Sequence, residues 1–228
     1  MNRVTSRIAL VLFVGSVLIS GTGFCAQQAP TPNKPNVWEP TIEAFEKQDK
    51  AKPPLKDAIL FAGSSSIRLW DLAKYFPDLD VINRGFGGSQ IADSVHYAPR
   101  VVIKYQPRLV VFYAGDNDLA FGKKPERVAA DFRAFATAVH KDLPKTRILF
   151  LSIKPSIQRW KLWDKGQKAN AEIEEFCKQH GQLVYVDVAK PMLGEDGKPK
   201  LELFAKDGLH LNAKGYELWT SIVKPLLR

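Results

Sequence analysis

Apolar residues gather in five short runs that alternate with longer amphipathic segments. The runs have the length of β-strands and cover residues 58–61, 80–82, 109–114, 148–153 and 183–188. A continuous apolar run, in contrast to a strict alternation of apolar and polar positions, is typical of a strand that is buried on both faces. The pattern therefore predicts a sheet whose two faces are both covered.

Between these runs, apolar positions recur every three to four residues, as they do on one face of a helix. The predicted helices cover residues 41–50, 67–76, 91–105, 126–143, 165–180 and 213–226. A break is expected near Pro99 because proline lacks the N–H that a helix interior needs. Strands that alternate with helices predict an α/β fold with a parallel sheet and right-handed crossover connections.

The first 25 residues differ from the rest of the chain. Arg3 and Arg7 precede an apolar run over residues 8–19, and small residues follow. This pattern is typical of a secretory signal peptide over residues 1–25, and the run is too short to predict a membrane span. The sequence thus predicts export to the periplasm or the extracellular space, with an uncleaved anchor as the alternative. Phe24, directly before Cys25, argues against a lipid-anchored cysteine.

Residues 26–40 are rich in proline and predict an extended linker to a single domain over residues 41–228. The formal charge of the chain is +9, but its lysines are scattered and no nucleic-acid motif accompanies them. We therefore expect a solvated basic surface without a nucleic-acid partner. If Cys25 leaves with the signal, Cys177 has no cysteine to pair with, which predicts a buried structural thiol.

The leading candidate for chemistry follows the first predicted strand, where Gly63 precedes three serines. A tight turn here would place a serine at the carboxyl end of a strand and beside a helix N-terminus. Serine is also a preferred residue at the N-cap of a helix. This segment alone therefore does not distinguish a nucleophile from a cap.

Three later segments carry further polar or flexible groups. Residues 83–89 are rich in glycine but lack the spacing of a dinucleotide-binding loop. An asparagine stands between two aspartates at 116–118, and no other acids or histidines cluster with them to predict a metal site. Asp207 and His210 are three residues apart, a spacing at which a carboxylate can orient an imidazole.

Taken in order, these four segments resemble the marker blocks of the SGNH hydrolases, also called the GDSL-type esterases and lipases. Gly63-Ser64-Ser65 stands in the place of a Gly-Asp-Ser block, 83–88 resembles Asn-x-Gly-x-x-Gly, 115–118 resembles Gly-x-Asn-Asp, and 207–210 resembles Asp-x-x-His. Ser64 replaces the usual aspartate, as it does in sequences that resemble the subunits of platelet-activating-factor acetylhydrolase. The resemblance extends from about residue 57 to the last residue.

The resemblance implies a three-layer α/β/α fold with a roughly five-stranded, parallel, flavodoxin-like sheet. The residues that it implies are Ser65 as nucleophile, His210 as general base, Asp207 as orienting acid, and Ser65, Gly88 and Asn117 as donors to the oxyanion. Ser64 and Ser66 stay open as alternatives for the nucleophile. No metal or organic cofactor is implied.

The segment 154–163 bears on the substrate because it carries three cations and two tryptophans. Arg159 is predicted to hold an anionic group and Trp160 to stack on a sugar ring, unless the tryptophans pack the next helix onto the sheet. Together with export, this segment predicts a secreted esterase for short-chain, above all acetyl, esters of small molecules or carbohydrates. The alternatives are a lysophospholipase or thioesterase of the same fold, and a catalytically silent ligand-binding module.

Overall fold

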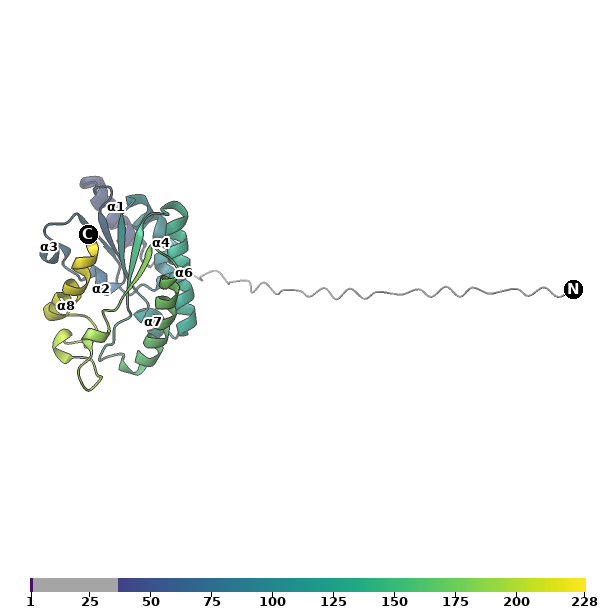
Figure 1. Cartoon of the computed structure of the whole chain (residues 1–228). Coiled ribbons are helices and arrows are strands. Elements are labelled where there is room, and N and C mark those ends of the chain that lie inside the picture. The colour runs from purple at the N-terminus through teal and green to yellow at the C-terminus, as the bar shows by residue number, and fades with distance from the viewer. Residues whose placement is uncertain (2–36) are drawn as a thin grey trace.

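The computed structural model describes Met1 and residues 37–228 (Figure 1). The predicted signal peptide and most of the predicted linker lie outside the described residues. The strands are β1 (Ile59–Gly63), β2 (Val81–Gly85), β3 (Leu109–Tyr113), β4 (Arg147–Leu151) and β5 (Leu183–Val186). They form one parallel sheet in the order β2-β1-β3-β4-β5, which confirms the predicted α/β fold.

Each strand contributes to two hydrophobic cores because successive side chains point to opposite faces of the sheet. Leu60 and Phe112 belong to one core and Phe61 and Tyr113 to the other. The first core is covered by α1 (Glu39–Ala51), α4 (Ile91–Val101), α6 (Pro125–Asp142) and α7 (Trp163–Lys178). The second is covered by α2 (Ser65–Arg68), α3 (Leu72–Tyr75) and α8 (Ala213–Val223). Figure 1 shows the resulting three layers.

The strand order creates a crevice at the carboxyl edge of the sheet. The chain passes from β1 to β2 on one side of β1 and returns to β3 on the other. At such a switch point the connections leave in opposite directions, and ligands bind between them. The N-terminus of α2 follows β1 directly, and α5 (Asp116–Ala120) follows β3. The segments that the sequence singled out therefore meet at this edge.

The helices differ from the expected ones in three places. The predicted helix 67–76 is two short helices, because the side chain of Asp71 accepts a hydrogen bond from the N–H of Lys74 at 3.1 Å and starts a new helix. α4 continues past Pro99 to Val101, because proline lacks only its own N–H and the next bonds, such as Val102 N–H to Ala98, still form. α1 begins at Glu39, inside the predicted linker, with proline in its first turn.

Charged side chains make several of the contacts between α1 and the rest of the domain. Asp49 pairs with Arg84 of β2 and accepts a hydrogen bond from the Tyr105 hydroxyl at 2.6 Å. Near the other end of the helix, Arg100 of α4 pairs with Glu39 at 2.5 Å and with Glu46 at 2.8 Å. Ile42 is the one α1 side chain that is fully buried. These ion pairs add to the apolar contacts that Ile42 and Phe45 make with the first core.

Cys177 is buried in the first core, as predicted, and this burial raises the pKa of its thiol to about 12. Among the described helices, none has the length and apolarity that crossing a lipid bilayer requires. The remaining regular structure consists of short 3-10 turns at Ile103–Tyr105, Trp160–Leu162, Lys190–Met192, Leu201–Leu203 and Lys224–Leu227.

Candidate active site

The turn between β1 and α2 presents one of the three serines to solvent. Gly63 has a φ of +129°, and a Cβ there would lie 2.0 Å from the carbonyl oxygen of Tyr113, so only glycine fits. Ser64 and Ser66 are buried, with 3% and 2% of their surface exposed, whereas Ser65 faces a cavity. The geometry therefore separates Ser65 from its two neighbours, which sequence alone did not.

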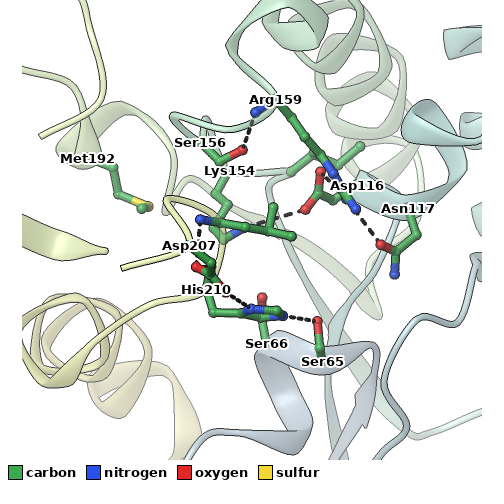
Figure 2. Close-up of polar contacts among 12 residues, drawn as sticks. Ser65, Ser66, Asp116, Asn117, Lys154, Ser156, Arg159, Met192, Asp207 and His210 are labelled. Carbon is green, nitrogen blue, oxygen red and sulfur yellow. Dashed lines mark hydrogen bonds and ion pairs between the residues drawn. The ribbon is translucent and has the colours of Figure 1, made fainter. Parts of the chain in front are cut away.

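Ser65, His210 and Asp207 form a continuous chain of contacts, drawn in Figure 2. The Nε2 atom of His210 lies 3.0 Å from the Ser65 hydroxyl oxygen, and its Nδ1 lies 2.6 Å from Asp207 Oδ2. Because an ionised carboxylate only accepts, Nδ1 carries the proton and Nε2 is left to accept from the serine. This arrangement can transfer the serine proton to the imidazole.

The loop that carries Asp207 also holds its carboxylate in place. Asp207 Oδ1 accepts hydrogen bonds from the backbone N–H groups of Leu209 at 2.9 Å and His210 at 3.0 Å. The hydrogen bond from the His210 side chain, followed by these two, lowers the pKa of Asp207 to about 2. A Gln158 N–H bond to the Gly208 carbonyl at 3.0 Å ties the loop to the segment after β4. Asp207 is therefore ionised at neutral pH.

On the opposite side of the serine, Gly88 and Asn117 face the same cavity. Gly88 has a φ of +80°, which glycine adopts without strain. The Asn117 side chain donates to the Ser89 carbonyl at 2.9 Å and accepts from Arg159 at 3.1 Å. Since arginine only donates, the Asn117 oxygen faces Arg159 and the amide NH₂ faces the other way.

A largely enclosed cluster of three charges, Asp116, Lys154 and Arg159, contacts Asn117 through Arg159 (Figure 2). Asp116 pairs with Arg159 at 3.0 Å and with Lys154 at 3.5 Å. Lys154 is only 3% exposed, and burial lowers the pKa of its ammonium while Asp116 opposes that shift. This cluster fixes the guanidinium that orients the Asn117 side chain.

Asp118 points away from this cluster. Both of its oxygens accept from the backbone N–H of Ile91 at 3.2 Å, and Oδ1 pairs with Lys123 at 2.8 Å. Lys123 also pairs with Asp131 at 2.7 Å. Burial raises the pKa of Asp118. The two aspartates beside Asn117 therefore have separate cationic partners, and no group of three or more potential metal ligands forms within the residues that the structure describes.

The cavity in front of Ser65 has a volume of about 470 Å³. It is lined by Trp38, Thr41, Ser65, Arg68, Gly87, Gly88, Asn117, Arg159, Leu209 and His210. Trp38 donates from its indole N–H to the Gly87 carbonyl at 2.9 Å, which fixes α1 against the glycine-rich loop. A larger hollow of about 600 Å³ lies near the C-terminus, away from all of the candidate residues.

Sequence reasoning missed Trp38, Thr41, Arg68 and Leu209. Trp38 falls in a segment interpreted as linker, and no pattern placed it near Ser65. The sequence does carry a signal for Arg68, because residues three apart on a helix share a face and Arg68 is three residues after Ser65. Trp160 is not part of the lining; it stacks on Trp163, with ring centroids 6.2 Å apart, and its contact with a sugar ring stays a prediction.

Comparisons with known proteins agree with this geometry. Residues 65–218 match the model of the GDSL-like lipase/acylhydrolase family. No curated protein matches the chain. The match covers well over half of the chain, which is sufficient to show the family.

Solved structures share the fold. A protein from Streptococcus pneumonia, provisionally described as a platelet activating factor, has a TM-score of 0.75 at 23% identity and covers 83% of this chain and 92% of its own. A GDSL-like lipase from Bacteroides thetaiotaomicron has a TM-score of 0.70 at 21% identity, and the match covers 82% of this chain and 96% of that protein. A carbohydrate esterase family 3 protein from Talaromyces cellulolyticus has a TM-score of 0.58 at 16% identity, and the match covers 74% of this chain and 95% of that protein. The chain therefore belongs to the GDSL-like lipase/acylhydrolase family of serine ester hydrolases.

Proposed function

We propose that the protein is an exported esterase that hydrolyses short-chain esters, acetyl esters above all, with Ser65 as nucleophile, His210 as general base and Asp207 as the acid that orients it. The observation that carries the proposal is the chain of contacts from Ser65 through His210 to Asp207, which opens into the cavity that Gly88 and Asn117 also face.

In the first half of the reaction, the Ser65 oxygen bonds to the ester carbonyl carbon while its proton passes to Nε2 of His210. Asp207 holds the Nδ1 proton and stabilises the imidazolium that forms. Collapse of the tetrahedral intermediate breaks the bond to the alcohol, which leaves with the proton from His210. Water then repeats these steps on the acyl-enzyme and releases the acid.

The negative charge that develops on the carbonyl oxygen needs donors that are already in place. We assign the backbone N–H groups of Ser65 and Gly88 and the amide of Asn117 to this role. Within residues 37–228, neither of the two N–H groups donates a hydrogen bond. The second amide proton of Asn117 is not used by the Ser89 carbonyl. These donors are therefore free for the oxyanion.

The size of the cavity favours a short acyl group. About 470 Å³ falls at the small end of the range for ligand sites, and this volume must also hold the alcohol part of the ester. Structures named as an acetyl esterase and as a carbohydrate esterase share the fold, which is consistent with acetyl esters of carbohydrates.

The nucleophile is tested with a fluorophosphonate that reacts with activated serines. We expect a single adduct on Ser65 by peptide mapping, with complete loss of activity toward p-nitrophenyl acetate. Ser66→Ala is the matched control, because Ser66 is the buried neighbour and its loss should leave labelling intact. An adduct on Ser64 or Ser66 would contradict the assignment.

A series of p-nitrophenyl esters of rising chain length, run beside acetylated oligosaccharides, tests the acyl group. We expect kcat/KM to be highest for acetyl donors. Faster turnover of palmitoyl esters or lysophospholipids would favour the lysophospholipase or thioesterase alternative. Binding without turnover of any ester would favour a ligand-binding module.

A further inference from the structure

Arg68 brings a positive charge to the cavity that the mechanism above does not use. It is the last residue of α2, three residues after Ser65, so the two side chains share a face of the helix. Arg68 and Arg159 both line the cavity, and no acidic residue does. The cavity therefore carries an unbalanced positive charge next to the nucleophile.

The two arginines differ in their partners. Arg159 pairs with Asp116 and donates to Asn117, so its guanidinium already has acceptors. Arg84 and Arg100 likewise pair with carboxylates. The side chain of Arg68, in contrast, makes no hydrogen bond or ion pair with any residue in the described part of the chain; only its backbone N–H donates, to the Ser64 carbonyl at 3.1 Å. Its donors are available to a ligand.

Gly87 gives the Arg68 guanidinium its place in the cavity wall. A Cβ on Gly87 would lie 2.9 Å from the Nε of Arg68 and 3.4 Å from its NH2 atom. The missing side chain thus lets the guanidinium lie against the loop that carries Gly88. The planar donor fork is held beside the proposed oxyanion site on one side and remains exposed on the other.

We propose that Arg68 binds a carboxylate of the substrate, and that the preferred substrates are esters that carry this anionic group in the acyl or alcohol part next to the scissile bond. The inference rests on the proposed function. A guanidinium recognises a carboxylate through paired, charge-assisted hydrogen bonds, which are about twice as strong as neutral ones. Arg68 thereby takes the anion-binding role that the sequence suggested for Arg159.

The test compares substrates that differ only in charge. One set consists of acetate esters of ω-hydroxy acids with two to five carbons, beside the corresponding methylamides. The other consists of monoethyl esters of dicarboxylic acids, beside their monoamides. Turnover is followed by acid release at constant pH, and each kcat/KM is divided by the rate of spontaneous hydrolysis. We expect wild-type protein to prefer the carboxylate member at one or more chain lengths by about 10- to 100-fold.

Arg68→Gln should remove most of this preference, and Arg68→Lys should keep part of it, since lysine retains the charge without the planar fork. Lys141→Gln is the matched control, because it removes one positive charge from the far end of α6, where Lys141 is exposed and outside the cavity. Thermal melts of each variant check that it is folded.

The outcomes separate this inference from the proposed function. Hydrolysis of neutral esters with no carboxylate preference in either set would overturn the role of Arg68 and leave the esterase intact. A preference that survives in Arg68→Gln would also overturn it. If wild-type protein hydrolyses p-nitrophenyl acetate but no ester in either set, this inference fails and the esterase stands; if it hydrolyses neither, both fail.

Discussion

His210 and Asp207 lie at an exposed edge of the site, whereas Lys154 and Asp116 on its other side are enclosed. The exposed fractions of their side chains are 29% and 45% for the first pair, and 1% and 14% for the second. In the proposed mechanism the exposed half passes protons, so its groups exchange partners during the reaction. The enclosed half holds Asn117 in one orientation. The proposed proton transfer and the orientation of Asn117 thus depend on groups that differ in their exposure to solvent.

The largest fall in activity is expected from substitutions of Ser65 and His210. Ser65→Ala removes the group that attacks the ester, so kcat should fall by roughly 10⁴–10⁶-fold. His210→Ala should cost about as much, and the double variant little more, because the two residues act as one unit. Single-turnover kinetics with p-nitrophenyl acetate measure this. Additive losses in the double variant would contradict a shared step.

The next effect concerns the enclosed half. Asn117→Ala should lower kcat by about 10²–10³-fold with little change in KM, because the lost donor acts on charge that exists only in the transition state. Steady-state kinetics and thermal melts on the same preparation test this. A variant that loses stability but keeps its kcat would show that Asn117 only supports the turn after β3.

Arg159→Met tests whether the guanidinium that contacts Asp116 and Asn117 acts by orienting Asn117. If Arg159 acts by orienting Asn117, the variant should lose about 10-fold in kcat, and adding it to Asn117→Ala should cost almost nothing more. A rise in KM with kcat unchanged would instead return Arg159 to the substrate-binding role predicted from the sequence. The double-mutant cycle measures the coupling directly.

A smaller effect on activity, but a clear one on stability, is expected at the neighbouring cluster. Lys123→Met leaves Asp118 and Asp131, which are 0% and 2% exposed, without their shared ammonium group. Removing one partner of a buried ion pair costs roughly 3–5 kcal/mol in the free energy of unfolding. Denaturant titration should show this loss while kcat of the folded protein is retained. A large fall in kcat would show that this cluster also acts on the cavity.

The smallest effect is a pH dependence of stability at Asp207. Its pKa of about 2 in the folded protein is lower than the ordinary value of 3.8, so the carboxylate stabilises the fold above about pH 4. That contribution is lost as the pH falls toward 2. Asp207→Asn should therefore melt on the order of 2 °C lower than wild-type protein at pH 6, and the difference should shrink at pH 3. A difference that is constant with pH would exclude this origin.

Local patterns and distant contacts differ in how well the sequence predicts them. The five apolar runs predicted the strands because a buried parallel strand is marked by its own residues. Ser65, Asn117, Asp207 and His210 are predicted as site residues because their four segments, taken in order, resemble the marker blocks of a known family. Trp38 was missed because its neighbour, Gly87, lies 49 residues away in the chain. No local spacing records such a contact.

The sequence also does not indicate which side chains are partners in ion pairs and ring contacts. Arg159 is predicted to bind an anionic group from the composition of its own segment, and nothing in that segment indicates Asp116 and Asn117 as partners, the latter 42 residues away. For Trp160 the sequence leaves two predictions open, stacking on a sugar ring and packing of the next helix, because an aromatic side chain near a strand end looks the same in sequence whether it faces a cavity or another tryptophan. Pairings of this kind depend on how the loops fold over the sheet.

The attachment of α1 sets a limit on how far the chain can be shortened. The family match begins at residue 65, yet Trp38 and Thr41 line the cavity from a helix that ends at Ala51. That helix contacts the domain through ion pairs of Asp49, Glu39 and Glu46 and through apolar packing of Ile42 and Phe45. Trimming the N-terminus past Trp38 would open one side of the cavity while leaving every strand intact, so the enzymatic unit is longer than the segment by which its family is recognised.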